Sequence, residues 1–226
     1  GAKYKGKFTG TSGLVNTYST FFSHHISTME GGLIATDDEE LYHILLSIRS
    51  HGWTRHLPKD NKVVEKSDNA FHESFRFVLP GYNVRPLDMS GALGKEQLRK
   101  LPAIISGRQE NAKFFVETFS KIEGISIQQE TGNSSWFGFA IICDAGSEMR
   151  DKLVEALTNE DVDCRPIVAG DFTKNEVMSY FDYELHGEMT NSSLIDSSGF
   201  FIGNHHYDVR SKLAAIATLI EQTLKA

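Results

Sequence analysis

The second half of the chain alternates strand-like apolar runs with helical patterns, and this alternation constrains the fold more than any other feature. Residues 134–143 (SSWFGFAIIC) are apolar enough for a core strand. Helical spacing follows at Met149, Leu153 and Leu157. A short strand is expected at 163–168, where Pro166 favours a sheet edge because proline cannot donate to the hydrogen-bond ladder. The pattern predicts an α+β domain for the second half.

Two helical patterns flank these strands. Residues 87–121 are expected to be helical with a break near Pro102, because a proline inside a helix removes a backbone hydrogen bond. Near the C-terminus, apolar residues recur on one helical face, which is expected to pack into the core: Val209, Leu213, Ile216, Ile220 and Leu224.

The first half is less regular. We expect a short strand at 14–18 and a buried strand at 33–35, followed by a helix that begins with a capping box between Thr36 and Glu39. Residues 51–80 are irregular, and a loop of this length inside a compact chain usually has a function. Three aromatic residues of this segment are expected to lie in the core: Phe71, Phe75 and Phe77.

Charge and cysteine content exclude several classes of function. The 226 residues carry a formal net charge of −7 without a basic run, which argues against nucleic-acid binding because phosphate contacts need clustered Lys and Arg. No apolar stretch approaches the length of a membrane span, so no membrane partner is expected. The two cysteines, Cys143 and Cys164, argue against a disulfide framework and fit a reducing cytoplasm.

Two blocks of sequence carry the chemistry. Residues 19–32 read STFFSHHISTMEGG, and residues 81–94 read GYNVRPLDMSGALG. In this order they resemble the sugar aminotransferase and dehydratase family of fold-type I pyridoxal-phosphate enzymes. Members of that family read roughly Ser-Phe-x-x-x-Lys-x-x-x-x-x-Glu/Asp-Gly-Gly and then Gly-x-Asn-x-Arg…Ala-x-Leu-Gly. Counting forward from Ser19 and backward from Glu30 places His24 where the family carries its lysine.

The resemblance covers essentially the whole chain and implies an α/β fold like that of aspartate aminotransferase. Residues 1–88 are then the C-terminal portion of a large cofactor-binding domain, and residues 89–226 form a small α+β domain. The family binds its cofactor through an aspartate and a helix N-terminus that lie upstream of the segment matched here. We therefore expect this chain to be a C-terminal piece of a longer enzyme and to be inactive alone.

Histidine in place of lysine changes the expected chemistry. A lysine amine condenses with the cofactor aldehyde, and an imidazole cannot form that imine. An imidazole still moves protons near neutral pH. The resemblance therefore implies that pyridoxal 5'-phosphate or pyridoxamine 5'-phosphate is bound non-covalently, with His24 as the catalytic acid and base.

The resemblance also implies a substrate and partners. It points to a dehydratase that removes the 3-hydroxyl of a nucleotide-linked 4-keto-6-deoxy sugar, with GDP-4-keto-6-deoxy-D-mannose as the expected substrate and L-glutamate as the amino donor. Such chemistry belongs to dideoxysugar biosynthesis for surface polysaccharide. Ser19 and Asn83 are expected at the cofactor phosphate, with Asn83 reaching a neighbouring subunit of a homodimer. Four further residues are expected to contact the substrate: His51, Arg55, Arg165 and His205. No metal site is expected.

The sequence has three alternative readings. A sugar-nucleotide aminotransferase is disfavoured because amino transfer to product uses the lysine that His24 replaces. An iron–sulfur dehydratase acting on a CDP-sugar is set aside because two cysteines cannot supply the usual four thiolates. A non-catalytic relic of such an enzyme stays open.

Overall fold

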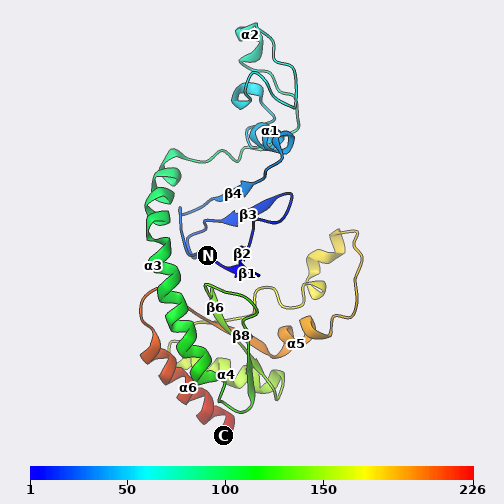
Figure 1. The fold of residues 1–226 in the computed structure, drawn as a ribbon. Coiled ribbons are helices and arrows are strands. Elements are labelled where there is room, and N and C mark those ends of the chain that lie inside the picture. Colours follow the sequence, from blue (N-terminus) through cyan, green and yellow to red (C-terminus); the bar gives the residue numbers. More distant parts are fainter. The chain divides into compact units, whose positions relative to one another are not determined.

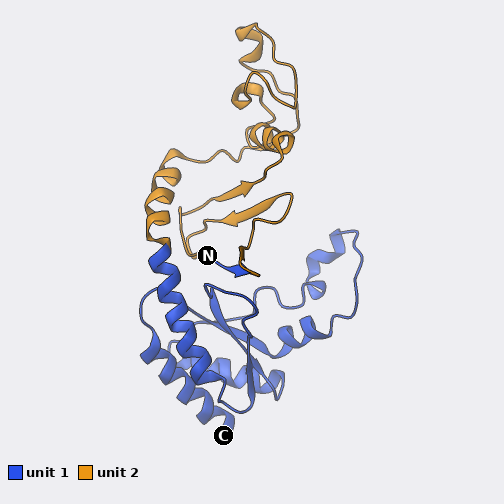
Figure 2. Ribbon diagram, viewed as in Figure 1, with its two compact units in different colours: residues 1–4, 102–226 blue, residues 5–101 orange.

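The computed structural model describes residues 1–226, which divide into two compact units (Figure 2). One unit comprises residues 1–4 and 102–226, and the other comprises residues 5–101. The division falls inside the long helix α3 (Asp88–Phe119), which begins where the sequence places the change of domain. The assignment of residues 1–88 and 89–226 to the two domains of a longer enzyme stays a prediction.

The C-terminal unit is built on a four-stranded antiparallel sheet (Figure 1). Its strand order is β5 (Ile125–Ile127), β6 (Gly138–Cys143), β8 (Gly199–Gly203) and β7 (Cys164–Arg165). Side chains alternate across β6, so that Phe139, Ile141 and Cys143 are buried while their neighbours are half-buried. Strand β7 lies at the edge of the sheet, which confirms the position that Pro166 indicated.

Helices α4 (Ser147–Asn159), α6 (Arg210–Lys225) and the second half of α3 supply the rest of this core. Helix α4 buries Leu153 and Leu157, and α6 buries Leu213, Ala217 and Ile220. The ring of Phe115 on α3 stacks on Phe139 with centroids 4.4 Å apart. The two helical faces read from the sequence are therefore confirmed as core faces.

The expected break of the long helix at Pro102 is wrong. Helix α3 continues through this residue. A proline leaves the carbonyl four residues earlier without its helical donor. Pro102 and Leu98 are both exposed, so water can hydrogen-bond to that carbonyl.

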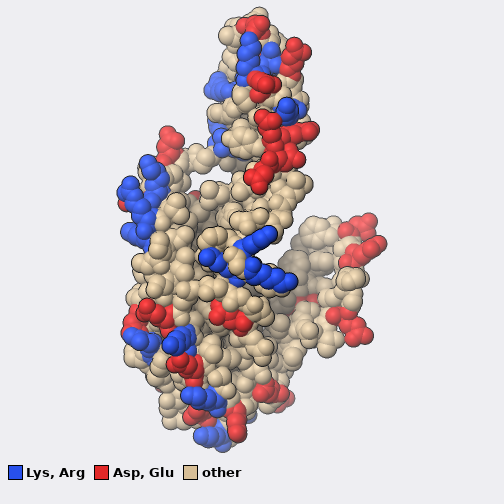
Figure 3. Space-filling view, in the orientation of Figure 1, with Lys and Arg blue, Asp and Glu red and all other residues tan.

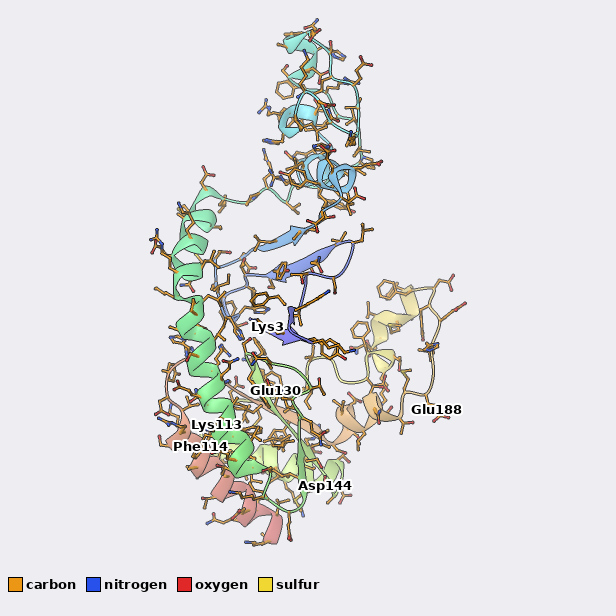
Figure 4. The ribbon with its side chains drawn as sticks, in the orientation of Figure 1. Lys3, Lys113, Phe114, Glu130, Asp144 and Glu188 are labelled. Carbon is orange, nitrogen blue, oxygen red and sulfur yellow. The ribbon has the colours of Figure 1, made fainter.

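A long excursion joins β7 to β8. It contains two 3-10 turns, η2 (Phe172–Lys174) and η3 (Glu176–Tyr180), and then helix α5 (Thr190–Ser198). Asp171 stabilises the start of this segment, because its buried carboxylate accepts hydrogen bonds from the hydroxyls of Ser193 and Thr173, each at 2.6 Å. These bonds lower the pKa of Asp171. The excursion carries acidic side chains and no Lys or Arg between residues 175 and 189 (Figure 3), and Glu188 marks its far part (Figure 4).

Strand β1 (Lys3–Tyr4) belongs to the C-terminal unit. Lys3 lies beside the loop that carries Glu130 (Figure 4), and its backbone exchanges hydrogen bonds of 2.7 and 2.8 Å with that of Asn133. The chain then enters the other unit at strand β2 (Lys7–Phe8).

The unit of residues 5–101 contains a β-hairpin and a helix joined to a long loop. The hairpin pairs β3 (Asn16–Ser19) with β4 (Gly32–Ala35), and helix α1 (Glu39–Ile48) follows. Residues 51–80 are irregular as expected, apart from η1 (Thr54–His56) and the one-turn helix α2 (Ala70–Glu73).

Three expectations for this unit are wrong. Strand β4 is exposed at all four residues, so it is not a buried strand in this chain. The cap of α1 is Asp38, which accepts from the Leu41 N–H at 2.9 Å, while the Thr36 hydroxyl donates to the Leu14 carbonyl instead. The aromatic run is not core, because Phe71, Phe75 and Phe77 are 90%, 69% and 53% exposed.

None of the helices of the chain, α3 included, is both long and apolar enough to span a membrane.

Candidate active site

His24 lies near the middle of the turn that joins the two strands of the hairpin. Strand β3 ends at Ser19 and β4 begins at Gly32, directly opposite in the register. Between them the backbone N–H of Thr28 donates to the Thr20 carbonyl at 2.9 Å, which closes a loop of residues 21–27. The His24 N–H donates to the Phe21 carbonyl at 3.0 Å and forms the turn at the tip of this loop. The His24 side chain is therefore held on a short closed loop.

The surroundings of His24 are open and polar. The side chain is exposed, with the Ser23 hydroxyl 3.4 Å from its Nδ1 atom and the Phe21 ring edge-on at 6.0 Å between centroids. His25 is half-buried. This exposure suits a group that exchanges protons with a bound molecule.

Ser19 is the second candidate cofactor residue on this hairpin. It is exposed, and its Oγ accepts from the Phe21 N–H at 3.3 Å, which leaves the hydroxyl proton available to a phosphate oxygen. The structure thus brings a hydroxyl donor and an imidazole together on one hairpin, as the sequence predicted. Their roles stay predictions.

The donor set of this hairpin fits a phosphorylated pyridine held without a covalent bond. It offers a hydroxyl and an imidazole, and the chain has no lysine between Lys7 and Lys59. An amine that could condense with an aldehyde is therefore missing from the whole hairpin and from helix α1.

Asn83 and His51 come together through backbone pairing. Ser50 and Asn83 form an antiparallel bridge, and the His51 N–H donates to the Tyr82 carbonyl at 2.8 Å. The close approach requires glycine. Gly52 has φ +80°, and a Cβ there would lie 1.6 Å from the Leu79 carbonyl oxygen. The Gly-Tyr-Asn and His-Gly-Trp motifs are thus two halves of one backbone contact, which sets Asn83 beside His51.

Arg55 is held against an aromatic surface in the same loop. Its guanidinium carbon lies 3.8 Å from the centroid of the Trp53 ring, and Phe75 and Phe77 stack on that ring at 5.3 and 5.6 Å. Trp53 is buried and its indole N–H donates to the Ser74 carbonyl at 3.0 Å. Cation–π contact fixes the guanidinium while its donors stay exposed, an arrangement suited to binding a diphosphate.

The loop around Arg55 is anchored by a carboxylate that the sequence did not single out. Glu73 is buried and accepts hydrogen bonds from the Ser67 N–H at 2.7 Å, Arg76 at 2.7 Å and the Thr54 hydroxyl at 2.9 Å. These donors, the Ser67 N–H first, lower the pKa of Glu73 to about 2. The sequence gives no pattern for this role, because the three donors are at irregular distances along the chain, three, six and nineteen residues from Glu73.

Arg165 and His205 belong to the other unit. Arg165 is an exposed residue of β7 that ion-pairs with Asp163 at 2.9 Å, so binding a phosphate there requires it to leave Asp163. His205 follows β8 and stacks on Tyr207 with centroids 4.1 Å apart. Burial lowers the pKa of His205, and the neighbouring His206 and Arg108 lower it further. The two residues lie on neighbouring chain segments and not in one cluster.

No group of histidine, cysteine and acidic residues in the chain has metal-binding geometry. Both cysteines are free thiols, and burial raises the pKa of each to about 11.

Comparison with known proteins agrees with the sequence motifs. The chain is 55% identical over 225 residues to the GDP-4-keto-6-deoxy-D-mannose 3-dehydratase of Yersinia pseudotuberculosis, which covers 98% of this chain and 57% of that protein. A solved GDP-4-keto-6-deoxymannose-3-dehydratase with a trapped PLP-glutamate geminal diamine matches with a TM-score of 0.94 at 52% identity, over 97% of this chain and 58% of that one. A solved histidine-to-asparagine variant of GDP-4-keto-6-deoxymannose-3-dehydratase with bound GDP-perosamine matches with a TM-score of 0.93 at 53% identity, over 97% of this chain and 58% of that one.

The chain thus spans little more than half the length of the relatives that it matches. The structural matches confirm the expected α/β fold of a pyridoxal-phosphate-dependent, aminotransferase-like enzyme. The sequence model of one family matches residues 1–206. The chain belongs to the DegT/DnrJ/EryC1/StrS aminotransferase family.

Proposed function

We propose that the protein of which this chain forms part is a dehydratase that removes the 3-hydroxyl of GDP-4-keto-6-deoxy-D-mannose. The observation that carries the proposal is the exposed His24 at the lysine register of a segment that contains no lysine. Such a site keeps the acid–base function and loses the covalent attachment on which amino transfer to a product depends. The dehydratase names of the relatives agree with this reading.

The residues of the chain divide the task between them. The pyridoxamine form of the cofactor supplies an amine for the 4-keto carbon and a path for electrons toward the sugar. His24 removes a proton from the carbon next to that amine and then protonates the 3-hydroxyl as it leaves as water. Ser19 donates to the cofactor phosphate, and Asn83 does so across the interface of a homodimer. His51, Arg55, Arg165 and His205 bind the sugar nucleotide, with Arg55 at the diphosphate.

The cycle closes with an amino donor. L-glutamate would supply the amino group that returns the cofactor to its pyridoxamine form and would leave as 2-oxoglutarate, a proposal supported by the glutamate adduct trapped in a solved relative. The product is the 4-keto-3,6-dideoxy sugar, released together with ammonia. We place the reaction in the cytoplasm, on the strength of the two free thiols, and in the biosynthesis of surface polysaccharide.

Mass spectrometry of the product tests the function. The full-length gene product, supplied with cofactor, L-glutamate and the GDP-sugar, should yield a sugar nucleotide lighter by one oxygen atom. An amino sugar would identify an aminotransferase, and unchanged substrate would identify a relic. His24→Asn should lower the rate by about 10²–10⁴-fold, the usual contribution of an acid–base group. The matched control is His25→Asn, which should retain most of the activity. Loss of activity in His25→Asn with retention in His24→Asn would shift the assignment by one residue.

A further inference from the structure

The loop that carries His24 is closed by a pair of buried hydroxyls. The Oγ1 atoms of Thr20 and Thr28 lie 2.7 Å apart, and the two residues are only 4% and 7% exposed. His24 lies midway between them in the sequence, four residues from each. The hydroxyl pair therefore lies at the neck of the loop, on either side of the candidate base.

Hydrogen bonds join this pair to the backbone of the loop. The Thr28 hydroxyl lies 3.0 Å from the Glu30 carbonyl and 3.5 Å from the Thr20 carbonyl, so Glu30 is the nearer acceptor for its single proton. With the proton on Glu30, the bond between the two hydroxyls is donated by Thr20 and accepted by Thr28. In this arrangement the Thr28 hydroxyl both accepts and donates, whereas the Thr20 hydroxyl donates.

Neighbouring glycines leave space for this pair. Gly31 has φ +144°, and a Cβ there would lie 2.9 Å from the Thr28 hydroxyl and 3.0 Å from the Thr20 hydroxyl. A Cβ on Gly94 of helix α3 would lie 3.2 Å from the Thr28 methyl group. The hydroxyls therefore occupy the space beside Gly31, and the Thr28 methyl group lies close to α3 at Gly94. The two sequence blocks of the family resemblance, residues 19–32 and 81–94, thus come together at Thr28.

We infer that Thr28, assisted by Thr20, is a positioning residue that fixes the His24 imidazole for proton transfer. The inference rests on the proposed dehydratase function. The loop side chains at Phe22, Ser23 and His24 are exposed, whereas the hydroxyls at the neck are buried, so the neck is a fixed base for the loop. Misplacement of a reacting group by about 1 Å can lower a rate by roughly 10². Loosening the neck should therefore lower kcat while substrate binding is kept.

Variants of the full-length gene product test this inference. Thr28→Val keeps the shape and removes both hydrogen bonds, so we expect kcat to fall about 10–100-fold with KM changed by less than about threefold. Thr20→Val removes a donor only and should lower kcat by a smaller factor. Thr28→Ser restores the hydroxyl and should return kcat to within about threefold of the original. The double variant should be no worse than Thr28→Val alone, because both changes break the same hydrogen-bonded pair.

A matched control lies at the open end of the same hairpin. The Thr36 hydroxyl donates to the Leu14 carbonyl at 2.7 Å and also links the two sides of the hairpin. If the effect depends on the position of the hydroxyl at the neck, and not on the loss of any threonine hydroxyl, Thr36→Val should leave kcat unchanged. Equal effects of Thr36→Val and Thr28→Val would overturn the inference, as would a Thr28→Val enzyme with normal kcat. Should Thr28→Val fail to fold, Thr20→Val and Thr28→Ser decide.

The result also separates this inference from the proposed function. Normal dehydration by the His24→Asn variant would refute the proposed role of His24 in the dehydratase reaction. Loss of dehydration in His24→Asn together with normal kcat in Thr28→Val would refute the positioning role alone.

Discussion

Replacing Asn111 by leucine should destabilise the C-terminal unit more than any other single polar change on helix α3. Asn111 is 1% exposed, and its amide nitrogen donates to the carbonyls of His205 at 2.9 Å and Tyr207 at 2.8 Å. It also lies 3.3 Å from the Asn204 Oδ1 atom, and the Asn111 Oδ1 atom accepts from the Val209 N–H at 3.2 Å. One side chain thus serves the backbone of the segment that carries His205.

The magnitude follows from these bonds. The amide nitrogen has two protons, so the side chain makes two donated bonds and one accepted bond; at about 0.5–1.5 kcal/mol each, their loss is roughly 3 kcal/mol. Leucine has the same branched shape, so no cavity is left. With a denaturant slope of about 2 kcal/mol per molar, the urea midpoint should fall by about 1.5 M.

Urea unfolding followed by far-UV circular dichroism measures this shift. Gln109→Leu is the matched control, because the Gln109 amide also makes two hydrogen bonds, to Asn133 and Ser134, but the side chain is only half-buried. Its midpoint should change by less than about 0.5 M. An Asn111→Leu midpoint equal to that of Gln109→Leu would refute the reasoning from buried hydrogen bonds.

Three further predictions concern the other unit and the assembly. Glu73 has a pKa of about 2 when folded, below its usual value, so its contribution to stability is present above about pH 4.5 and is lost as the pH falls toward 2. In unfolding experiments at a series of pH values, Glu73→Gln should reduce this loss of stability in acid, and an unchanged pH profile would contradict the role of Glu73. The full-length gene product should sediment as a dimer at micromolar concentration if Asn83 serves a partner's site, and a monomer would exclude that role. The 226-residue chain alone should show no dehydration with added pyridoxamine phosphate and L-glutamate, because positioning of the cofactor contributes several kcal/mol to catalysis.

Periodicity predicted those parts of the fold whose side chains face a core within this chain. The faces of α4 and α6, the strand at residues 138–143 and the edge position of β7 follow from patterns of buried apolar residues. The same reasoning failed at β4 and at the phenylalanines of residues 71–77, which are apolar and yet exposed in this chain. Apolar composition indicates that a residue favours burial, but it does not identify the surface that covers it.

The candidate site shows the same limit. The register of the motif singled out His24 and Ser19, which the structure places on one hairpin, whereas the pairing that sets His51 beside Asn83 was not predicted. The supporting residues Thr20, Thr28, Glu73 and Asn111 were not identified, because their roles depend on hydrogen bonds between residues distant in sequence. For Thr20 and Thr28, the symmetric placement about His24 was the one signal in the sequence.

Borohydride reduction tests the non-covalent role of His24 most directly. The full-length gene product in its pyridoxal form is treated with borohydride and digested, and the peptide that contains His24 is analysed by mass spectrometry. We expect no cofactor on that peptide or on any lysine peptide, since an imidazole forms no reducible imine. The His24→Lys variant should carry the reduced cofactor at residue 24 and should show a shifted cofactor absorbance and impaired dehydration. A reduced cofactor adduct on a lysine of the unmodified enzyme would contradict the assignment of His24 as a base that works without a covalent link.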